Sequence, residues 1–436
     1  MTQTRQAQTP LAETPGADTP LAVLIGIDWA DQHHDVAWQA QAGAPVSHRR
    51  IAHTPEAIGA WLAEMRVAFP GGALGIAVET SRGPLVHALL DHADVVLYPV
   101  NPRSLQRFRE AFAPSGAKDD LPDAALLLEL VAKHRDRLRA WAPAQPAVRA
   151  LKRLVESRRR AIALRTTVLQ QLTAALKEYD PHALRWAGDD LSAPMARAFL
   201  RQWPTLAAVQ RARATTLQRF YTQHNCRNTS KIAQHLAEIA AAAPLTRDDA
   251  IIDPSVLVVT MLVGQLDALT PSIARFDADI ATRFAAHPDA ALFLALPGSG
   301  AALAPRLLAV FGADRTRFPS ARDVQQLAGI APVTKRSGRT CVVHWRWAAP
   351  TFVRQTFHEF ARASIRWSPW AGAYFAQQRA RGCSLHAAVR ALAFKWIRII
   401  WRCWYDHTLY DEARYTRALH LRGAPLAAQL PLALAA

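Results

Sequence analysis

The chain has 436 residues, half of them hydrophobic, which is enough for two or three domains with sizeable cores and excludes an intrinsically disordered protein. Its formal net charge is +17, with 52 Lys and Arg residues against 35 Asp and Glu residues. Such an excess favours a polyanionic partner, and nucleic acid is the commonest one for a soluble basic protein. We find no apolar run near the length of a membrane span and no basic amphipathic terminal helix, so we expect no membrane contact and a cytoplasmic protein.

The cysteines and the N-terminal segment exclude further classes. None of the four cysteines pairs with another at the spacing of a zinc site, so neither a structural metal nor a disulfide framework is predicted. Residues 1–20 contain three Thr-Pro pairs and no basic segment leading into an apolar one. They predict a disordered tail and not a signal peptide.

Residues 21–140 alternate predicted strands with predicted helices. Strands are expected at 22–28, 34–40, 73–79 and 94–100, and helices at 54–69, 81–93, 102–112 and from about Asp120. An opening antiparallel pair followed by this alternation predicts an α/β sandwich. The cluster His33, His34 and Asp35 falls in an alternating stretch, and we interpret it as part of a strand edge and not as a metal site.

Residues 141–287 lack strand signals and predict a helical arm. From Val148 to Leu176, apolar residues recur at alternating three- and four-residue steps, with Arg158 and Arg165 set into the seam. This pattern fits either one long helix packed in a bundle or a coiled coil. The arginines favour an extended arm that meets a partner helix or a nucleic acid.

Residues 288–422 predict a helical C-terminal domain, followed by a tail at 423–436. "LPGSG" resembles a helix-hairpin-helix turn, in which Gly298 and Gly300 let backbone N–H groups approach a DNA phosphate; an ordinary Gly-rich helix turn is the alternative. From residue 335 to residue 422 there are 16 Lys and Arg residues against 4 Asp and Glu residues, together with 7 of the 13 tryptophans. The apolar helix at 391–405 favours burial in the domain or an oligomer core over stacking on bases.

Four carboxylates stand where chemistry is expected. Asp28 and Glu79 end buried strands, while Asp120 and Asp123 lie at a helix start. The carboxyl ends of strands line the ligand crevice of an α/β sheet, and carboxylates gathered there repel one another unless a cation lies between them. A pair of magnesium ions would relieve that repulsion and serve phosphoryl transfer. The alternatives are a solvated strand end for Glu79 and a capping box for Asp120 and Asp123.

The order "GID", "VETSRGPL", "NPRSLQRF" and "KDDLPDA" resembles the N-terminal domain of the DEDD transposases of the insertion-sequence one-ten family. The resemblance implies an RNase H-like, RuvC-like fold in which Asp28, Glu79, Asp120 and Asp123 bind Mg²⁺. Asp119 stands where that family usually has Thr.

The family resemblance continues in "LAGIAPVTKRSGRT". It implies that Ser337 is a nucleophile that attacks a DNA phosphodiester and holds the strand end as a phosphoserine ester. Lys335, Arg336 and Arg339 would offset charge on the phosphoryl oxygens, and the helix containing Arg354 fits the family's later segment. Without the resemblance, a Ser-Gly between basic residues is usually a plain loop.

The resemblance therefore implies a transposase that recombines the DNA of its own insertion sequence. It also implies a homo-oligomer, a dimer or tetramer bridged through the arm, and a noncoding guide RNA that pairs with donor and target DNA. Two alternatives stay open. One is a RuvC-like nuclease without a covalent intermediate, and the other is an inactive nucleic-acid-binding scaffold whose binding is indifferent to chelators.

Overall fold

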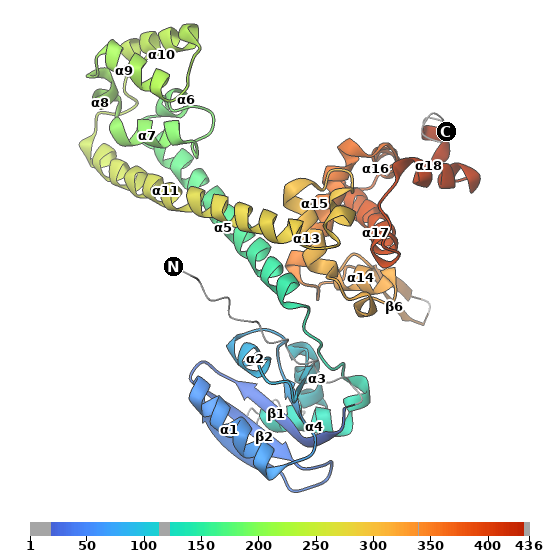
Figure 1. Cartoon of the computed structure of the whole chain (residues 1–436). Helices are drawn as coiled ribbons and strands as arrows, with labels where there is room; N and C mark the ends of the chain where they lie inside the picture. The colour runs from blue at the N-terminus through green and yellow to red at the C-terminus, as the bar shows by residue number, and fades with distance from the viewer. Residues whose placement is uncertain (1–18, 113–122, 339, 431–436) are drawn as a thin grey trace, which may run out of the picture. The chain divides into compact units, whose positions relative to one another are not determined.

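The computed structural model describes residues 19–112, 123–338 and 340–430, which belong to two compact units, Met1–Pro143 and Ala144–Ala436 (Figure 1). Two predicted site residues, Asp120 and Arg339, lie outside the described residues, as does most of the predicted N-terminal tail. The first unit is a mixed α/β domain, and the described part of the second is mostly helical.

The first unit is built on a five-stranded sheet with the strand order β3-β2-β1-β4-β5. The first three strands are antiparallel, and β4 and β5 continue parallel to β1. The strand bounds are Leu21–Trp29 for β1, His33–Gln39 for β2, Ser47–Ala52 for β3, Ala73–Val78 for β4 and Val95–Pro99 for β5. The four predicted strands are thus confirmed, whereas β3 was missed because only Ile51 of its six residues is buried.

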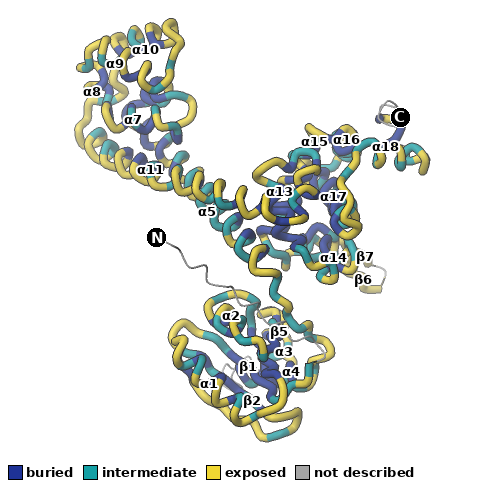
Figure 2. The backbone as a smooth tube through the Cα atoms, viewed as in Figure 1, coloured by how far each residue is buried: buried dark blue, intermediate teal, exposed yellow. Residues whose placement is uncertain are grey.

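Helices cover both faces of this sheet, as Figure 2 shows by the buried strands beneath them. Side chains of successive strand residues point to opposite faces, so Val23, Ile25 and Ile27 pack with α1 (Pro55–Ala68) and α2 (Pro84–Leu89). Leu24, on the other face, packs with α3 (Pro102–Phe112) and α4 (Asp123–Lys133). The α/β sandwich predicted from the sequence is confirmed.

The second unit opens with the predicted long helix, α5 (Pro146–Tyr179), which packs lengthwise against α11 (Asp249–Ala285). The two helices are antiparallel, because Leu151 of α5 shares a core with Phe284 of α11, whereas Leu172 shares another with Val263. The partner helix suggested by the heptad seam is therefore a helix of the same chain. Arg158 in the seam forms an ion pair with Asp277 of α11.

A small bundle lies between these two helices in the sequence and packs at one end of them (Figure 1). Its helices are α6 (Ala183–Trp186), α7 (Pro194–Gln202), α8 (Leu206–Gln210), α9 (Ala214–Gln223) and α10 (Thr229–Ala241). Its core is rich in aromatic rings, among them the buried Trp186, Phe199 and Tyr221.

Helix α11 corrects one expectation. By length and composition it is long and apolar enough to cross a membrane, although no run of that kind was predicted from the sequence. Within the described residues, however, α11 packs along α5 and α7, and Asp267 pairs with Arg197 and Arg201 of α7. Val259, Leu262, Val263 and Leu266 of α11 are buried in the arm, whereas Leu257, Val258 and Met261 are exposed.

The other end of the arm merges into the C-terminal helices, because Leu151, Val155, Ile280 and Phe284 belong to the same core as those helices. The elements are α12 (Ala290–Leu294), α13 (Gly300–Phe311), α14 (Ala321–Leu327), β6 (Val333–Ser337), β7 (Thr340–His344), α15 (Thr351–Trp367), α16 (Pro369–Ala380), α17 (Leu385–Tyr405) and α18 (Glu412–Leu421).

Helix α17 contains the apolar stretch 391–405, and its Trp396, Ile400 and Trp404 are buried in this core. Burial in the domain, the favoured interpretation, is confirmed for these side chains. Two features differ from expectation. The hairpin β6–β7 interrupts the helical domain, and Leu430, in the predicted tail, packs into the core after a short 3₁₀ turn.

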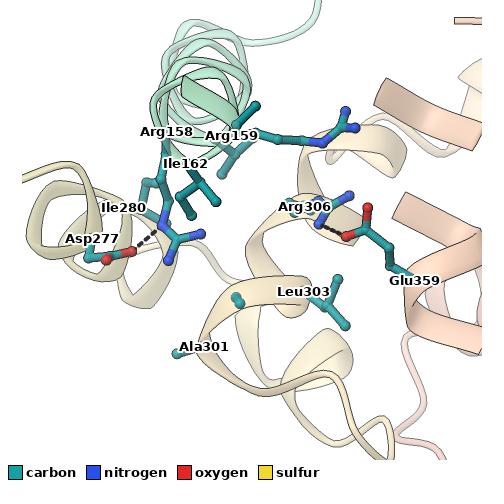
Figure 3. A pocket seen from close by; sticks show the side chains of 12 residues that line it. Arg158, Arg159, Ile162, Asp277, Ile280, Ala301, Leu303, Arg306 and Glu359 are labelled. Atoms are coloured by element: carbon teal, nitrogen blue, oxygen red, sulfur yellow. Dashed lines mark hydrogen bonds and ion pairs between the residues drawn. The ribbon is translucent and has the colours of Figure 1, made fainter. Parts of the chain in front are cut away.

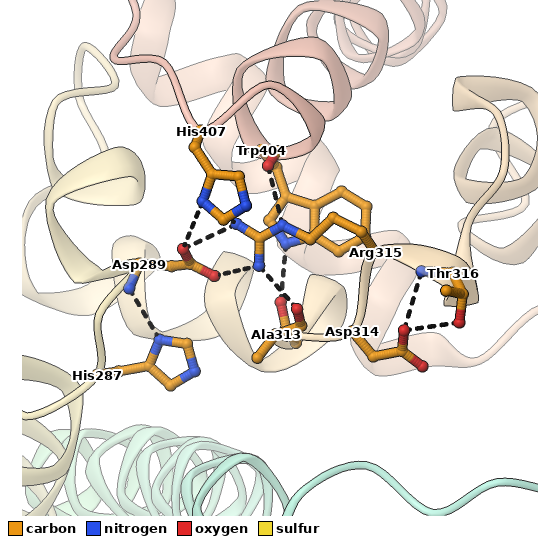
Figure 4. Close-up of polar contacts among 9 residues, drawn as sticks. His287, Asp289, Ala313, Asp314, Arg315, Thr316, Trp404 and His407 are labelled. Carbon is orange, nitrogen blue, oxygen red and sulfur yellow. Dashed lines mark hydrogen bonds and ion pairs between the residues drawn. The ribbon is translucent and has the colours of Figure 1, made fainter.

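A buried ion pair near the start of this domain is hydrogen-bonded to its last third (Figure 4). Arg315 donates to both oxygens of Asp289 at 2.5 and 2.8 Å, and its Nε donates to the Trp404 carbonyl oxygen at 3.1 Å. Only 5 % of the Asp289 side chain is exposed. Arg315 thereby ties the start of α12 to the end of α17.

Candidate active site

The acidic residues of the first unit gather at one edge of the sheet. In the parallel register of β1 and β4, Ile27 is aligned with Val78, so Asp28 and Glu79 follow as neighbours at the carboxyl ends of adjacent strands. Aligned residues on neighbouring strands point to the same face. That face is the one covered by α4, since Ala77, two residues before Glu79, packs with α4.

Gly26 explains how the third carboxylate reaches this edge. A Cβ on Gly26 would overlap the Ala124 carbonyl oxygen and the Leu128 amide nitrogen, so α4 lies directly on β1 at this point. Gly26 and Asp28 share a face because they are two residues apart in a strand. The first residue of α4, Asp123, is thereby brought beside Asp28.

The electrostatics agree with this placement. Burial, together with the charges of Asp123, Glu79 and Asp35, raises the pKa of Asp28 to about 6, against an opposing effect of Arg109. Burial is the largest cause of this shift, and repulsion between neighbouring carboxylates adds to it. A cation placed among these side chains would remove the repulsion.

The donor set suits a hard divalent cation, because carboxylate oxygens are the ligands that Mg²⁺ prefers. In this structure Asp123 forms an ion pair with Arg109 of α3. Among the described residues, no three His, Cys, Asp or Glu side chains are close enough to hold a metal ion. The described carboxylates thus have the right chemistry but do not by themselves close a metal cage.

Two further residues belong to this site: Asp35, which was interpreted from the sequence only as part of a strand edge, and Arg109, which was not singled out. Asp35 is aligned with Asp28 across β1 and β2, and Arg50 of β3 binds it through two hydrogen bonds of 2.9 and 3.1 Å. Arg109 faces the carboxylates from α3. The short turn between β1 and β2 would have revealed Asp35, because it fixes the register; the position of Arg109 had no comparable local signal.

Ser337 lies at the tip of the β6–β7 hairpin in the second unit. It is paired with Thr340, and Gly338 follows with a φ of 54°, which suits a tight turn. Ser337, Lys335 and Arg336 are all exposed. Because strand side chains alternate, Lys335 and Ser337 share one face of the hairpin and Arg336 points to the other. The hydroxyl is therefore accessible to a large substrate.

The two glycines of "LPGSG" have different surroundings. Both have positive φ values, 78° for Gly298 and 50° for Gly300. A Cβ on Gly298 would come within 2.9 to 3.0 Å of Trp367 and the Ala363 backbone, whereas one on Gly300 would meet nothing within 4 Å. Gly298 thus permits close packing of α15, and Gly300 is the exposed one at the start of α13.

Arg354 of α15 braces the segment that follows the hairpin. Its Nη2 donates to the carbonyl oxygens of Trp347 at 2.9 Å and Arg346 at 3.3 Å. Trp345 lies between two guanidinium groups: its ring centroid is 3.8 Å from the Cζ atom of Arg390 and 5.5 Å from that of Arg354. These contacts hold the basic hairpin against the helical core.

Carboxylates gathered at the ends of parallel strands, in one chain with an exposed basic hairpin, are typical of enzymes that act on phosphodiesters. The comparison with known families makes this specific. The DEDD transposase model of IS110 matches residues 25–181, and a second model, described as the transposase IS116/IS110/IS902 family, matches residues 290–376. The chain belongs to this family and is a DNA transposase.

Individual relatives cover nearly the whole chain. The mini-circle candidate transposase of IS117 from Streptomyces coelicolor is 28 % identical over 90 % of this chain and 96 % of its own length. The uncharacterized 42 kDa protein of insertion element IS900 from Mycobacterium paratuberculosis is 27 % identical over 85 % and 92 %. The uncharacterized 43.6 kDa protein of IS110 from Streptomyces coelicolor is 24 % identical over 90 % and 96 %.

Proposed function

We propose that this transposase recombines the DNA of an insertion sequence through a covalent phosphoserine intermediate. In this mechanism Asp28, Glu79, Asp120 and Asp123 form an RNase H-like, RuvC-like acidic site, and Ser337 is the nucleophile. The observation that carries the proposal is the alignment of Asp28 with Glu79, with Asp123 brought onto the same face. Family membership supports the rest.

The reaction is a transfer of one phosphodiester bond. The Ser337 Oγ attacks phosphorus, a bond from Oγ to phosphorus forms, the bond to one strand end breaks, and the serine proton ends on the leaving DNA hydroxyl. Mg²⁺ held by the four carboxylates would neutralise charge on the phosphoryl oxygens. Lys335, Arg336 and Arg339 contribute positive charge around Ser337.

Several partners belong to the same proposal. Donor and target DNA are the substrates, Gly298, Gly300 and Arg354 contribute to nucleic-acid binding, and a noncoding RNA from the element guides target choice. The acidic site and Ser337 act together in a homo-oligomer, a dimer or tetramer. The net charge of +17 supports a polyanionic partner of this size.

The decisive experiment compares two hydroxyl deletions at the hairpin tip. Ser337→Ala should abolish both strand cleavage and the covalent protein–DNA adduct trapped by denaturation. Thr340→Ala, at the paired position, should retain both. Asp28→Asn should abolish cleavage while leaving DNA binding intact. If Ser337→Ala still cleaves DNA, the enzyme is a nuclease that hydrolyses with water, and the covalent mechanism is wrong.

A further inference from the structure

A cavity of about 390 Å³ lies where the arm joins the C-terminal helices (Figure 3). Helices α5, α11, α13 and α15 each contribute to its wall. It is lined by Val155, Arg158, Arg159, Ile162, Ala163, Asp277, Ile280, Ala301, Ala302, Leu303, Arg306 and Glu359. All of these residues belong to the second unit.

Several charged side chains line this cavity, and one of them has no ion-pair partner among the described residues. Three guanidinium groups, those of Arg158, Arg159 and Arg306, face two carboxylates. Arg158 is paired with Asp277, and Arg306 is paired with Glu359 at 2.5 Å. Arg159 forms no ion pair with a described residue, so one positive charge in the wall is left without a direct counterion.

Arg306 of the cavity wall has an unused donor. Its Nε donates to the Thr356 hydroxyl at 3.2 Å and its Nη1 to Glu359, but its buried Nη2 has no partner among the described residues. Only 8 % of Arg306 is exposed. An unsatisfied buried donor is costly, and a charged one more so, unless a ligand accepts its hydrogen bond.

Arg159 points to the same conclusion. Burial lowers its pKa, and the neighbouring charge of Arg306 lowers it further, against a smaller attraction by Glu359 and Glu156. Two guanidinium groups that repel each other in a partly buried wall create a site that an anion would stabilise. In Figure 3, Arg159 and Arg306 extend towards the same side of the cavity.

The first turn of α13 completes the wall. Ala301, Ala302 and Leu303 line the cavity and follow Gly300, the first residue of this 12-residue helix. The first N–H groups of a helix lack intrahelical partners and carry the positive end of the helix dipole. Ala301 and Ala302 are exposed, so the cavity opens to solvent beside these N–H groups.

We propose that this cavity binds one phosphodiester group of a nucleic-acid backbone between Arg159, Arg306 and the first turn of α13. A phosphodiester carries a single negative charge and accepts several hydrogen bonds, which suits the Arg159 guanidinium, which forms no ion pair with a described residue, and the unpartnered Nη2 donor of Arg306 in the same wall. The apolar side chains of Val155, Ile162 and Leu303 provide a surface for the adjoining sugar. This phosphate contact is remote in the sequence from the β6–β7 hairpin. It rests on the proposed function, in which nucleic acid is the substrate.

The test uses Arg159→Gln, because Arg159 forms no ion pair with a described residue that the substitution would break. The matched control is Arg160→Gln, which removes the same charge from the next, exposed residue of α5 outside the cavity. Both are made in full-length Asp28→Asn protein, so that binding is measured without cleavage. The probes are a duplex DNA, a single-stranded RNA of the same length, and inorganic phosphate.

Arg159→Gln should weaken binding about tenfold at low salt and reduce the slope of log affinity against log salt by about 0.9 for duplex DNA or about 0.7 for a single strand. The probe that shows the change identifies the backbone as DNA or RNA. Arg306→Lys, which keeps the charge but loses the forked donors, should weaken the same probe. Arg160→Gln should have a clearly smaller effect.

Equal affinities of Arg159→Gln and Arg160→Gln for both nucleic acids would overturn the assignment. A second outcome would also overturn it: inorganic phosphate raises the melting temperature only when Arg159 is present, while nucleic-acid binding does not require Arg159. The site would then bind a free anion. Failure of the covalent mechanism would leave these binding results unchanged, so the two proposals are tested separately.

Discussion

The Cα atom of Gly26 in β1 faces the backbone of Ala124 in α4 with no room for a side chain between them. This contact sets the height of α4 above the sheet. Because Asp123 begins α4 and Asp28 follows Gly26 by two residues, the same contact sets the approach of two carboxylates. Gly26 is therefore required both for the packing of α4 on β1 and for the approach of Asp123 to Asp28.

Gly26→Ala should destabilise the first unit by about 2–3 kcal/mol, because the added methyl group overlaps backbone atoms that cannot rotate away. Urea unfolding followed by tryptophan fluorescence measures this change. DNA cleavage should also fall in the folded fraction, since α4 and Asp123 are displaced from Asp28. An unchanged unfolding midpoint would show that α4 does not rest on Gly26.

Gly59 provides the matched control, since it lies inside α1 and a Cβ there would meet nothing within 4 Å. Gly59→Ala should stabilise the chain by about 0.4–1 kcal/mol through the lower entropy of the unfolded state.

Removing one partner of the buried Asp289–Arg315 pair should strongly lower the stability of the C-terminal helices. Asp289→Asn leaves the Arg315 charge without its bidentate partner and should destabilise the C-terminal helices by about 3 kcal/mol. Arg402→Gln, which breaks an exposed pair with Asp406 on α17, should cost less than about 0.5 kcal/mol. Thermal unfolding of the two variants side by side measures the difference. Equal melting temperatures would contradict the structural role of Arg315.

His34 predicts a pH-dependent stability of the first unit. It is fully buried, and burial, together with the charges of His53 and His33, lowers its pKa from 6.5 to about 4. The unfolded chain therefore binds the proton more readily between these values, so stability is complete above pH 6.5 and falls as the pH drops towards 4.

The loss attributable to His34 should reach about 3 kcal/mol at pH 4. Urea unfolding between pH 7 and pH 4 measures it as the difference between the wild type and His34→Phe, in which this titration is absent. Parallel pH profiles for the two proteins would show that His34 does not control the effect.

Alanine substitutions at the two glycines of the α12–α13 turn should have unequal costs in stability. Gly298→Ala places a methyl group against Ala363 and Trp367 in a left-handed conformation and should cost about 2–3 kcal/mol. Gly300→Ala has free space and should cost only about 1 kcal/mol of backbone strain. Circular dichroism melts measure both costs. Greater destabilisation by Gly300→Ala than by Gly298→Ala would show that Gly298 is not the glycine required for the close packing of α15.

The sequence predicted most of the first unit because its signals are local. Buried strands β1 and β4 show continuous apolar runs, and Thr54 caps α1 by accepting a hydrogen bond from the Ala57 amide, as its position before a helical pattern indicates. The exposed edge strand β3 lacks such a run, and its pairing with β2 depends on contacts that a polar sequence does not specify.

The site was partly predictable for the same reason. The ends of apolar strands pointed to Asp28 and Glu79, but Arg109 reaches Asp123 only through the packing of α3 beside α4. Likewise, the heptad seam predicted a partner for α5 without revealing that α11, about 100 residues later in the chain, supplies it. The cavity between Arg159 and Arg306 joins helices far apart in the sequence and had no local pattern.

Helix α5 leads away from the C-terminal core and α11 leads back to it, so the aromatic bundle α6–α10 is a single contiguous insertion at the turning point. Exchange of that one segment, or equal shortening of both helices by whole turns, would alter the far end of the molecule while preserving the junction at its base. The second unit therefore has one place where a segment can be replaced without altering its C-terminal core.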